Sequence, residues 1–302
     1  MSLTIALLSP KKIYLASDSI VVTPKPGESD RYSFDAVKIY PINQFVAATA
    51  VGKYQWLRDK KPTNLPLIFN EFKERYCTEG WSIKKIAYKL SSFFNERMKV
   101  KEQVEKFELK TVKKIKAKGK KIASTAFEYG WLAVNCRNEK GEITEGIKEY
   151  FSGTRILLTG FYRSFWPFLF CKPIPEIWQI SVPGNVEPVL NNRYERMRQG
   201  MTYTGIPAVV RELIEEETSP HANSKFKNPL KYKIDFKNIT EESAVELLKK
   251  LIGITTLLRK ASFASVNGKV LDDFSRRNVG GPVNLLSIDP KEGTKWIEKL
   301  EG

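Results

Sequence analysis

Histidine is almost missing from this sequence, which has only His221 among its 302 residues. A Ser-His-Asp triad or a histidine-bound zinc site would have to use this one side chain. We expect His221 to belong to an ordinary polar loop, because small polar residues surround it between 219 and 228. The shortage of histidine therefore argues against the commonest forms of acid–base and metal catalysis.

Cysteine is nearly as rare, and several cofactor motifs are absent. Cys77, Cys136 and Cys171 lie far apart and form no CxxC pair, which argues against a thiolate zinc site. Neither GxGxxG after a strand nor GxxxxGK[ST] occurs, so the usual dinucleotide and P-loop sites are not indicated. We predict a protein without metal or cofactor. No secretory apolar segment opens the chain, so we expect a cytoplasmic protein with reduced thiols.

Long uninterrupted apolar runs are also absent. The longest apolar stretch, 156–171, is broken by Arg163 and Pro167 and is too short to span a bilayer. We interpret it as buried strands and predict no membrane partner. An exposed aromatic interface between Phe161 and Phe170 is the alternative.

Positive charge is abundant: 50 Lys and Arg face 34 Asp and Glu, a formal net charge of +16. Such a balance favours anionic partners, although a lysine-rich surface on an ordinary protein would give the same numbers. The densest cluster has seven lysines at 110–121 and predicts either a solvated helix or loop, or a site for nucleic acid and other anions. No aromatic residue interrupts the cluster, which argues against single-stranded nucleic acid. Its candidate binding residues are Lys113, Lys114, Lys116, Lys118, Lys120 and Lys121.

Hydropathy patterns predict a mixed fold with strands first. Short apolar runs at 4–8 and 13–16 flank a turn, and 37–52 predicts two strands around a turn at 41–43. Helical periodicity follows at 65–76, with Asn64 as N-cap and an apolar face of Leu67, Ile68, Phe72 and Tyr76. It appears again after Ser82. Strands then resume at 129–136 and 176–182, before a helix at 207–217, a long helix capped by Thr240 and a last strand at 279–289. Consecutive helices between groups of strands favour layered α+β architecture over βαβ winding.

The start of the chain offers one route to catalysis that needs no histidine. A hydroxyl on the first residue can be activated by its own α-amine, whose ordinary pKa of roughly 7.7–8.0 suits a general base. The chemistry also needs a lysine to keep the amine neutral, an acid to orient the lysine and a backbone N–H to hold the oxyanion. Ser2, Asp18, Lys38 and Gly52 supply these groups at predicted strand ends.

Two starting residues satisfy this scheme. Ser2 becomes the first residue if Met1 is removed, which we expect because serine is small. If residues 1–3 do not belong to the natural chain, Thr4 would supply the hydroxyl instead. Starting at Thr4 would shorten the first strand by two residues and displace the nucleophile.

The order and spacing of five motifs resemble the proteasome β-subunit group of N-terminal-nucleophile hydrolases and its bacterial relatives. The motifs are IYLASD at 13–18, KIY at 38–40, AATAVG at 47–52, YTG at 203–205 and VGGPVNL at 279–285. The resemblance implies a four-layer αββα sandwich, in which helix pairs flank antiparallel sheets. It implies a single domain over 1–302, with insertions at about 101–154 and 219–235. Thr204 would assist the nucleophile, and the chain would form homo-oligomers or assemble with related subunits.

The chain departs from the family pattern at three places. Ser19 and Ile20 stand where the family has a basic residue after the acid. Arg276 and Val279 stand where the family has an acid and a serine before the glycine pair. Three functions therefore remain open. The first is a hydrolase of peptide or amide bonds, and the second is an inactive structural or assembly subunit with the same fold. The third is a nucleic-acid or anion-binding protein that uses the lysine cluster.

Overall fold

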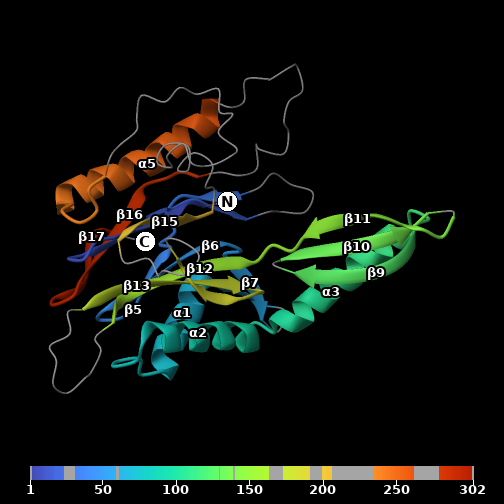
Figure 1. The fold of residues 1–302 in the computed structure, drawn as a ribbon, viewed down its shortest axis with the longest axis horizontal. Helices are drawn as coiled ribbons and strands as arrows, with labels where there is room; N and C mark the ends of the chain where they lie inside the picture. The colour runs from blue at the N-terminus through green and yellow to red at the C-terminus, as the bar shows by residue number, and fades with distance from the viewer. Residues whose placement is uncertain are drawn as a thin grey trace.

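The computed structural model describes residues 2–23, 31–58, 61–128, 130–138, 140–162, 173–190, 199–205, 234–261 and 279–300. It confirms a mixed α+β fold in which every described strand pair is antiparallel (Figure 1). The predictions for His221, Arg276, the helix at 207–217 and most of the insertion at 219–235 lie outside these residues.

Two five-stranded sheets form the centre of the protein. The first has the order β15-β1-β2-β16-β17 and comprises Gly200–Thr204, Thr4–Leu8, Ile13–Asp18, Val283–Asp289 and Gly293–Glu298. The second has the order β14-β13-β12-β6-β5 and comprises Val186–Pro188, Ile174–Val182, Thr154–Tyr162, Val46–Gly52 and Ile39–Asn43. Apolar side chains of both sheets share one buried cluster, which contains Ala6, Leu15, Ala47 and Leu157 among others. The sheets therefore pack face to face.

Helices cover the outer faces of the two sheets (Figure 1). Helix α5, Glu241–Ala261, packs on the first sheet through a cluster that includes Leu7, Ala16 and Leu248. Helices α1, Leu65–Arg75, and α2, Ile83–Arg97, pack on the second sheet. The order of layers is therefore helix, sheet, sheet and helix pair among the residues that the structure describes.

The predicted helix starts are confirmed by their caps. Asn64 Oδ1 accepts from the Leu67 N–H at 3.1 Å, Ser82 Oγ accepts from Lys85 N–H at 3.2 Å, and Thr240 Oγ1 accepts from Ser243 N–H at 3.2 Å. Each bond satisfies one of the N–H groups that a helix leaves unpaired at its beginning.

Three local expectations were wrong. The strand expected at 279–289 is not the last one, because β17 follows it. Pro41 lies inside β5 and pairs in register with Ala47, so the turn falls at Gln44 and Phe45. Strand β5 is the edge of its sheet, where a residue without an N–H is tolerated. Leu67 is exposed rather than part of the apolar face of α1, which Leu65, Ile68, Phe69 and Phe72 form.

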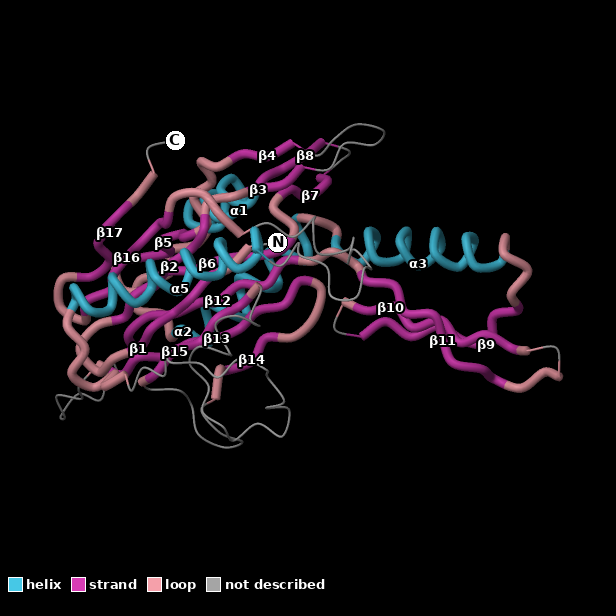
Figure 2. Tube along the Cα trace, turned by 90° about the horizontal axis from the view of Figure 1, so that it is seen from above, coloured by secondary structure: helices cyan, strands magenta, loops and turns pink. Residues whose placement is uncertain are grey.

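A separate unit extends away from the sheets, as Figures 1 and 2 show. Helix α3, Val100–Lys116, packs there on a three-stranded sheet of β9, Lys121–Glu128, β10, Trp131–Arg137, and β11, Ile143–Tyr150. Ile115, Leu132, Val134 and Cys136 form its small core. We call α3 and β9–β11 the projecting unit. That the projecting unit is an insertion relative to the proteasome group stays a prediction.

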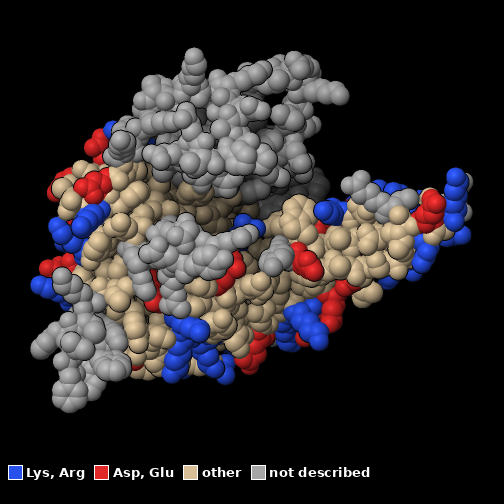
Figure 3. Space-filling view, viewed as in Figure 1, with Lys and Arg blue, Asp and Glu red and all other residues tan. Residues whose placement is uncertain are grey.

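The lysine cluster lies at the outer end of the projecting unit, where Figure 3 shows basic side chains. The candidate lysines that end α3 and begin β9 are exposed. Residues 113–116 belong to α3, so the predicted solvated helix is confirmed for this part of the cluster. Acidic side chains accompany them: Lys114 pairs with Glu149 at 3.2 Å, and Glu142 lies on the adjoining turn. Nucleic-acid binding by this cluster stays a prediction.

Three shorter features complete the described chain. Strands β3, Val21–Thr23, and β4, Arg31–Ser33, form one hairpin, and β7, Gln55–Arg58, and β8, Lys61–Asn64, form another. None of the described helices is long and apolar enough to cross a membrane. The described residues also contain no group of His, Cys, Asp and Glu side chains that could hold a metal ion.

Candidate active site

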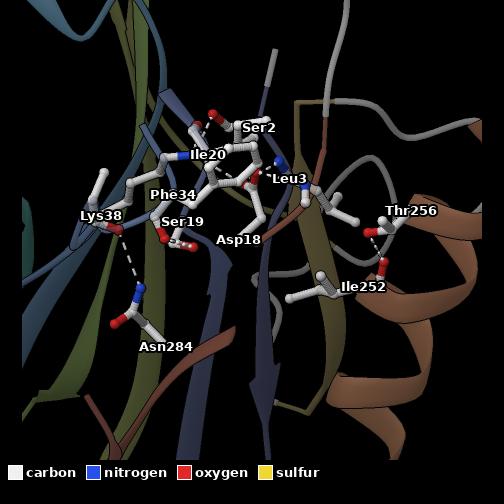
Figure 4. A network of polar contacts seen from close by, with 12 residues as sticks. Ser2, Leu3, Asp18, Ser19, Ile20, Phe34, Lys38, Ile252, Thr256 and Asn284 are labelled. Carbon is white, nitrogen blue, oxygen red and sulfur yellow. Dashed lines mark hydrogen bonds and ion pairs between the residues drawn. The ribbon is translucent and has the colours of Figure 1, made fainter. Parts of the chain in front are cut away.

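Lys38 is the centre of a buried polar cluster just before β5 (Figure 4). Its Nζ donates to Ser2 Oγ at 2.7 Å, to Asp18 Oδ1 at 3.0 Å and to the Ile20 carbonyl at 2.6 Å. An ammonium has three hydrogens to donate, so these three acceptors match it fully. Only 2% of Lys38 is exposed. The sequence places these side chains 36 and 20 residues apart, and the fold brings them together.

Asp18 ends β2 and orients the lysine. Its side chain is fully buried, and Oδ1 accepts from the Leu3 N–H at 3.0 Å as well as from Lys38. Oδ2 accepts from the Gly280 N–H at 3.3 Å. Two backbone N–H groups from opposite ends of the chain therefore hold the carboxylate against Lys38.

Burial shifts both partners of this ion pair toward neutrality. Loss of water raises the pKa of Asp18, and the Lys38 charge and the Leu3 N–H oppose that shift. Burial likewise lowers the pKa of Lys38, and the charge of Asp18 opposes it. The Lys38 ammonium donates to Ser2 Oγ, so its positive charge lies directly beside this hydroxyl.

Ser2 is held in place by the strands around it. It precedes β1, and only 8% of it is exposed. Gly205, which follows β15 at φ +112°, approaches so closely that a Cβ there would lie 1.8 Å from the Ser2 carbonyl oxygen. Any other residue at position 205 would push the start of the chain out of place. The YTG segment therefore contacts Ser2 through its glycine.

The other two hydroxyl candidates, Thr4 and Thr204, lie on the neighbouring strands β1 and β15. Thr4 pairs in register with Thr204 on β15, and both are buried. Thr4 Oγ1 has no hydrogen-bond partner among the described residues. The structure brings Ser2, rather than Thr4, into contact with Lys38.

Gly52 and Ser2 both line a small pocket of about 60 Å³. Ala50, Val51 and Leu65 form part of its apolar wall, while Lys38 contributes its polar part; Ile20, Val21, Val22 and Tyr54 complete the lining. Gly52 ends β6 with φ +97°, in the region that favours glycine. The arrangement places a serine hydroxyl, a buried lysine and a strand-end glycine around one cavity.

Replacing Gly52 with alanine should destabilise the protein more than the same change at Gly119. Both glycines have positive φ, but a Cβ on Gly52 would lie 2.2 Å from the Gly153 carbonyl oxygen, whereas Gly119 has open space. We expect Gly119→Ala to cost about 1–2 kcal/mol, and Gly52→Ala about 1–3 kcal/mol more because of the clash. Urea unfolding of both variants measures the difference. Equal losses in the free energy of unfolding would show that Gly52 does not lie so close to the Gly153 carbonyl oxygen.

Several contacts of the site escaped the analysis of the sequence. The Leu3 and Gly280 N–H groups and the Ile20 carbonyl are backbone atoms, which every residue type carries. The glycine pair at 280–281 was the one available signal, since it occurs in the last of the quoted motifs. Its second member also has a packing role, because a Cβ on Gly281 would lie 2.3 Å from Ser19 Oγ.

Not every predicted residue joins this cluster. The lysines at 113–121 lie on the projecting unit, and none of them lines the pocket. Val279, which stands where the family has a serine, is a buried apolar residue packed with α5.

No protein-family model matches the chain, and no curated protein is significantly similar to it in sequence.

Proposed function

We propose that this protein is a proteasome-like N-terminal-nucleophile hydrolase that cleaves peptide or amide bonds. One observation carries the proposal: the buried Lys38 ammonium donates to both Ser2 Oγ and Asp18 Oδ1. A buried lysine and its carboxylate are costly to desolvate, so such a pair beside a serine hydroxyl suggests a chemical role.

The arrangement of layers also supports the proposal. Two antiparallel sheets packed face to face, with helices outside, agree with the four-layer αββα sandwich that the sequence motifs implied. One flanking layer contains the pair α1 and α2, and the other contains α5 among the described residues. We propose that the chain adopts this fold and assembles with copies of itself or related subunits.

In the proposed reaction, Ser2 acts after Met1 has been removed. The free α-amine of Ser2 accepts the Oγ proton while Oγ forms a bond to the substrate carbonyl carbon. The Lys38 charge lowers the proton affinity of that amine, and Asp18 keeps the lysine oriented. The Gly52 N–H stabilises the oxyanion. The proton then passes to the leaving amine as the C–N bond breaks, and water hydrolyses the resulting ester.

The pocket indicates which substrates fit. Its volume of about 60 Å³ and its wall of Ala50, Val51 and Leu65 suit a small apolar group beside the scissile bond. We therefore propose substrates with such a side chain next to the cleaved amide.

The state of the native N-terminus tests the proposed function. Intact-mass and peptide mass spectrometry should show that Met1 is absent and that Ser2 carries a free amine. A β-lactone inhibitor should then acylate Ser2 Oγ, because the amine and Lys38 activate that oxygen. Retained Met1, or a Ser2 that stays unlabelled in the processed protein, would rule the hydrolase out.

A further inference from the structure

The backbone of Lys53, the residue that follows Gly52, is held by a set of hydrogen bonds. The Lys53 N–H donates to the Gly153 carbonyl at 2.7 Å, and the Lys53 carbonyl accepts from Thr154 Oγ1 at 2.7 Å. Trp56 Nε1 in turn donates to Thr154 Oγ1 at 2.9 Å. Trp56 is fully buried, and Thr154 nearly so. Both polar atoms of the Lys53 backbone therefore have hydrogen-bond partners.

The Lys53 side chain reaches in a different direction, toward helix α3. Its Nζ donates to Gln103 Oε1 at 3.1 Å and lies 4.3 Å from the ring centre of Trp56 and 5.4 Å from that of Phe151. Burial lowers the pKa of Lys53. A cation that has lost part of its water interacts more strongly with ring faces and amide oxygens, so these contacts restrain the residue.

Gln103 and Phe151 both belong to the base of the projecting unit. Gln103 lies in the first turn of α3, and its Nε2 donates to the Met98 carbonyl at 2.7 Å and the Leu57 carbonyl at 3.0 Å. Phe151 follows β11, and its ring lies 5.3 Å from Phe107 of α3 and 6.0 Å from Phe127 of β9. Lys53 thus contacts the helix and, through Phe151, the sheet of that unit.

We propose that Lys53 is a positioning residue that couples the projecting unit to the Gly52 amide of the active site. This inference rests on the proposed function, because it assigns to Gly52 the oxyanion contact. A change in the angle of the projecting unit moves Gln103 and Phe151, and through Lys53 it displaces the residue next to Gly52 and so shifts the Gly52 N–H. A partner that binds the projecting unit can therefore regulate hydrolysis without touching the pocket.

The expected signature is a loss of kcat rather than of substrate affinity. Lys53 does not line the pocket that holds Ser2, so its removal leaves the binding surface intact. Removing an oxyanion donor outright costs about 10²–10³ in kcat, and loosening its support should cost about tenfold. We expect the Lys53→Met variant to lose about tenfold in kcat while KM changes less than about twofold.

Two further variants complete the experiment. Lys53→Arg keeps a cation that can reach Gln103 and the Trp56 ring, so it should restore most of kcat. Lys85→Met is the matched control, because Lys85 Nζ lies 4.0 Å from the Trp81 ring centre on the outer layer and outside the pocket. It should leave kcat unchanged.

Hydrogen exchange separates this inference from the proposed function. In Lys53→Met and in Gln103→Leu, the amides of residues 52–54 should exchange at least about tenfold faster than in the wild type, since local opening becomes easier. Unchanged exchange, together with unchanged kcat, would overturn the coupling while the hydrolase stands. Faster exchange in both variants, together with a wild-type protein that cleaves no amide, would instead overturn the catalytic role of Gly52 while the coupling stands.

Discussion

Ser2→Ala is expected to lower the rate of amide hydrolysis by about 10³-fold or more, because it removes the proposed nucleophile. Lys38 keeps Asp18 Oδ1 and the Ile20 carbonyl as acceptors in this variant. The free energy of unfolding should therefore fall by only about 1–3 kcal/mol, the cost of one lost partner of a buried charged donor. Steady-state kinetics with a small amide substrate and urea unfolding measure the two effects.

Thr4→Val distinguishes the two hydroxyl candidates. Valine has nearly the shape of threonine, and Thr4 Oγ1 has no partner to lose among the described residues. We expect this variant to be processed and to remain active and folded. Loss of activity in Thr4→Val combined with full activity in Ser2→Ala would transfer the nucleophile to Thr4 and contradict our assignment.

Lys38→Met is expected to destabilise the protein by about 3–5 kcal/mol, because it leaves the Asp18 carboxylate buried without its opposite charge. The double variant Lys38→Met/Asp18→Asn removes both charges and should recover much of that loss. Urea unfolding of the wild type, the two single variants and the double variant gives the coupling between the two residues. Hydrolysis should be lost in every variant that lacks Lys38.

Lys114→Met provides the comparison with an exposed ion pair. Lys114 Nζ lies 3.2 Å from Glu149 Oε1, and more than half of the lysine side chain is exposed. Its replacement should cost less than about 1 kcal/mol, since water screens such pairs. If Lys38→Met were no more harmful than Lys114→Met, the buried position of the Lys38–Asp18 pair would be wrong.

Local sequence patterns predicted much of the fold because their physical causes are local. The apolar residues Ile83, Ile86, Ala87, Leu90 and Phe94 recur at helical spacing and form the buried face of α2. The predictions failed where the conformation or burial of a residue depends on neighbouring elements of the fold. Pro41 is accepted inside a strand because β5 lies at a sheet edge, and Leu67 is exposed because α1 turns a different face toward the second sheet.

By itself, the sequence determined the chemical groups that are available: a hydroxyl at residue 2, an acid that ends a strand, a lysine that begins one and a glycine that ends another. It also determined an α+β class, through the alternation of strand and helix periodicities. Only the tertiary structure decided that Lys38 meets Ser2 and Asp18, and that Lys53 meets Gln103 of the projecting unit. These contacts depend on how sheets and helices pack across long separations in the chain, which periodicity within one segment does not encode.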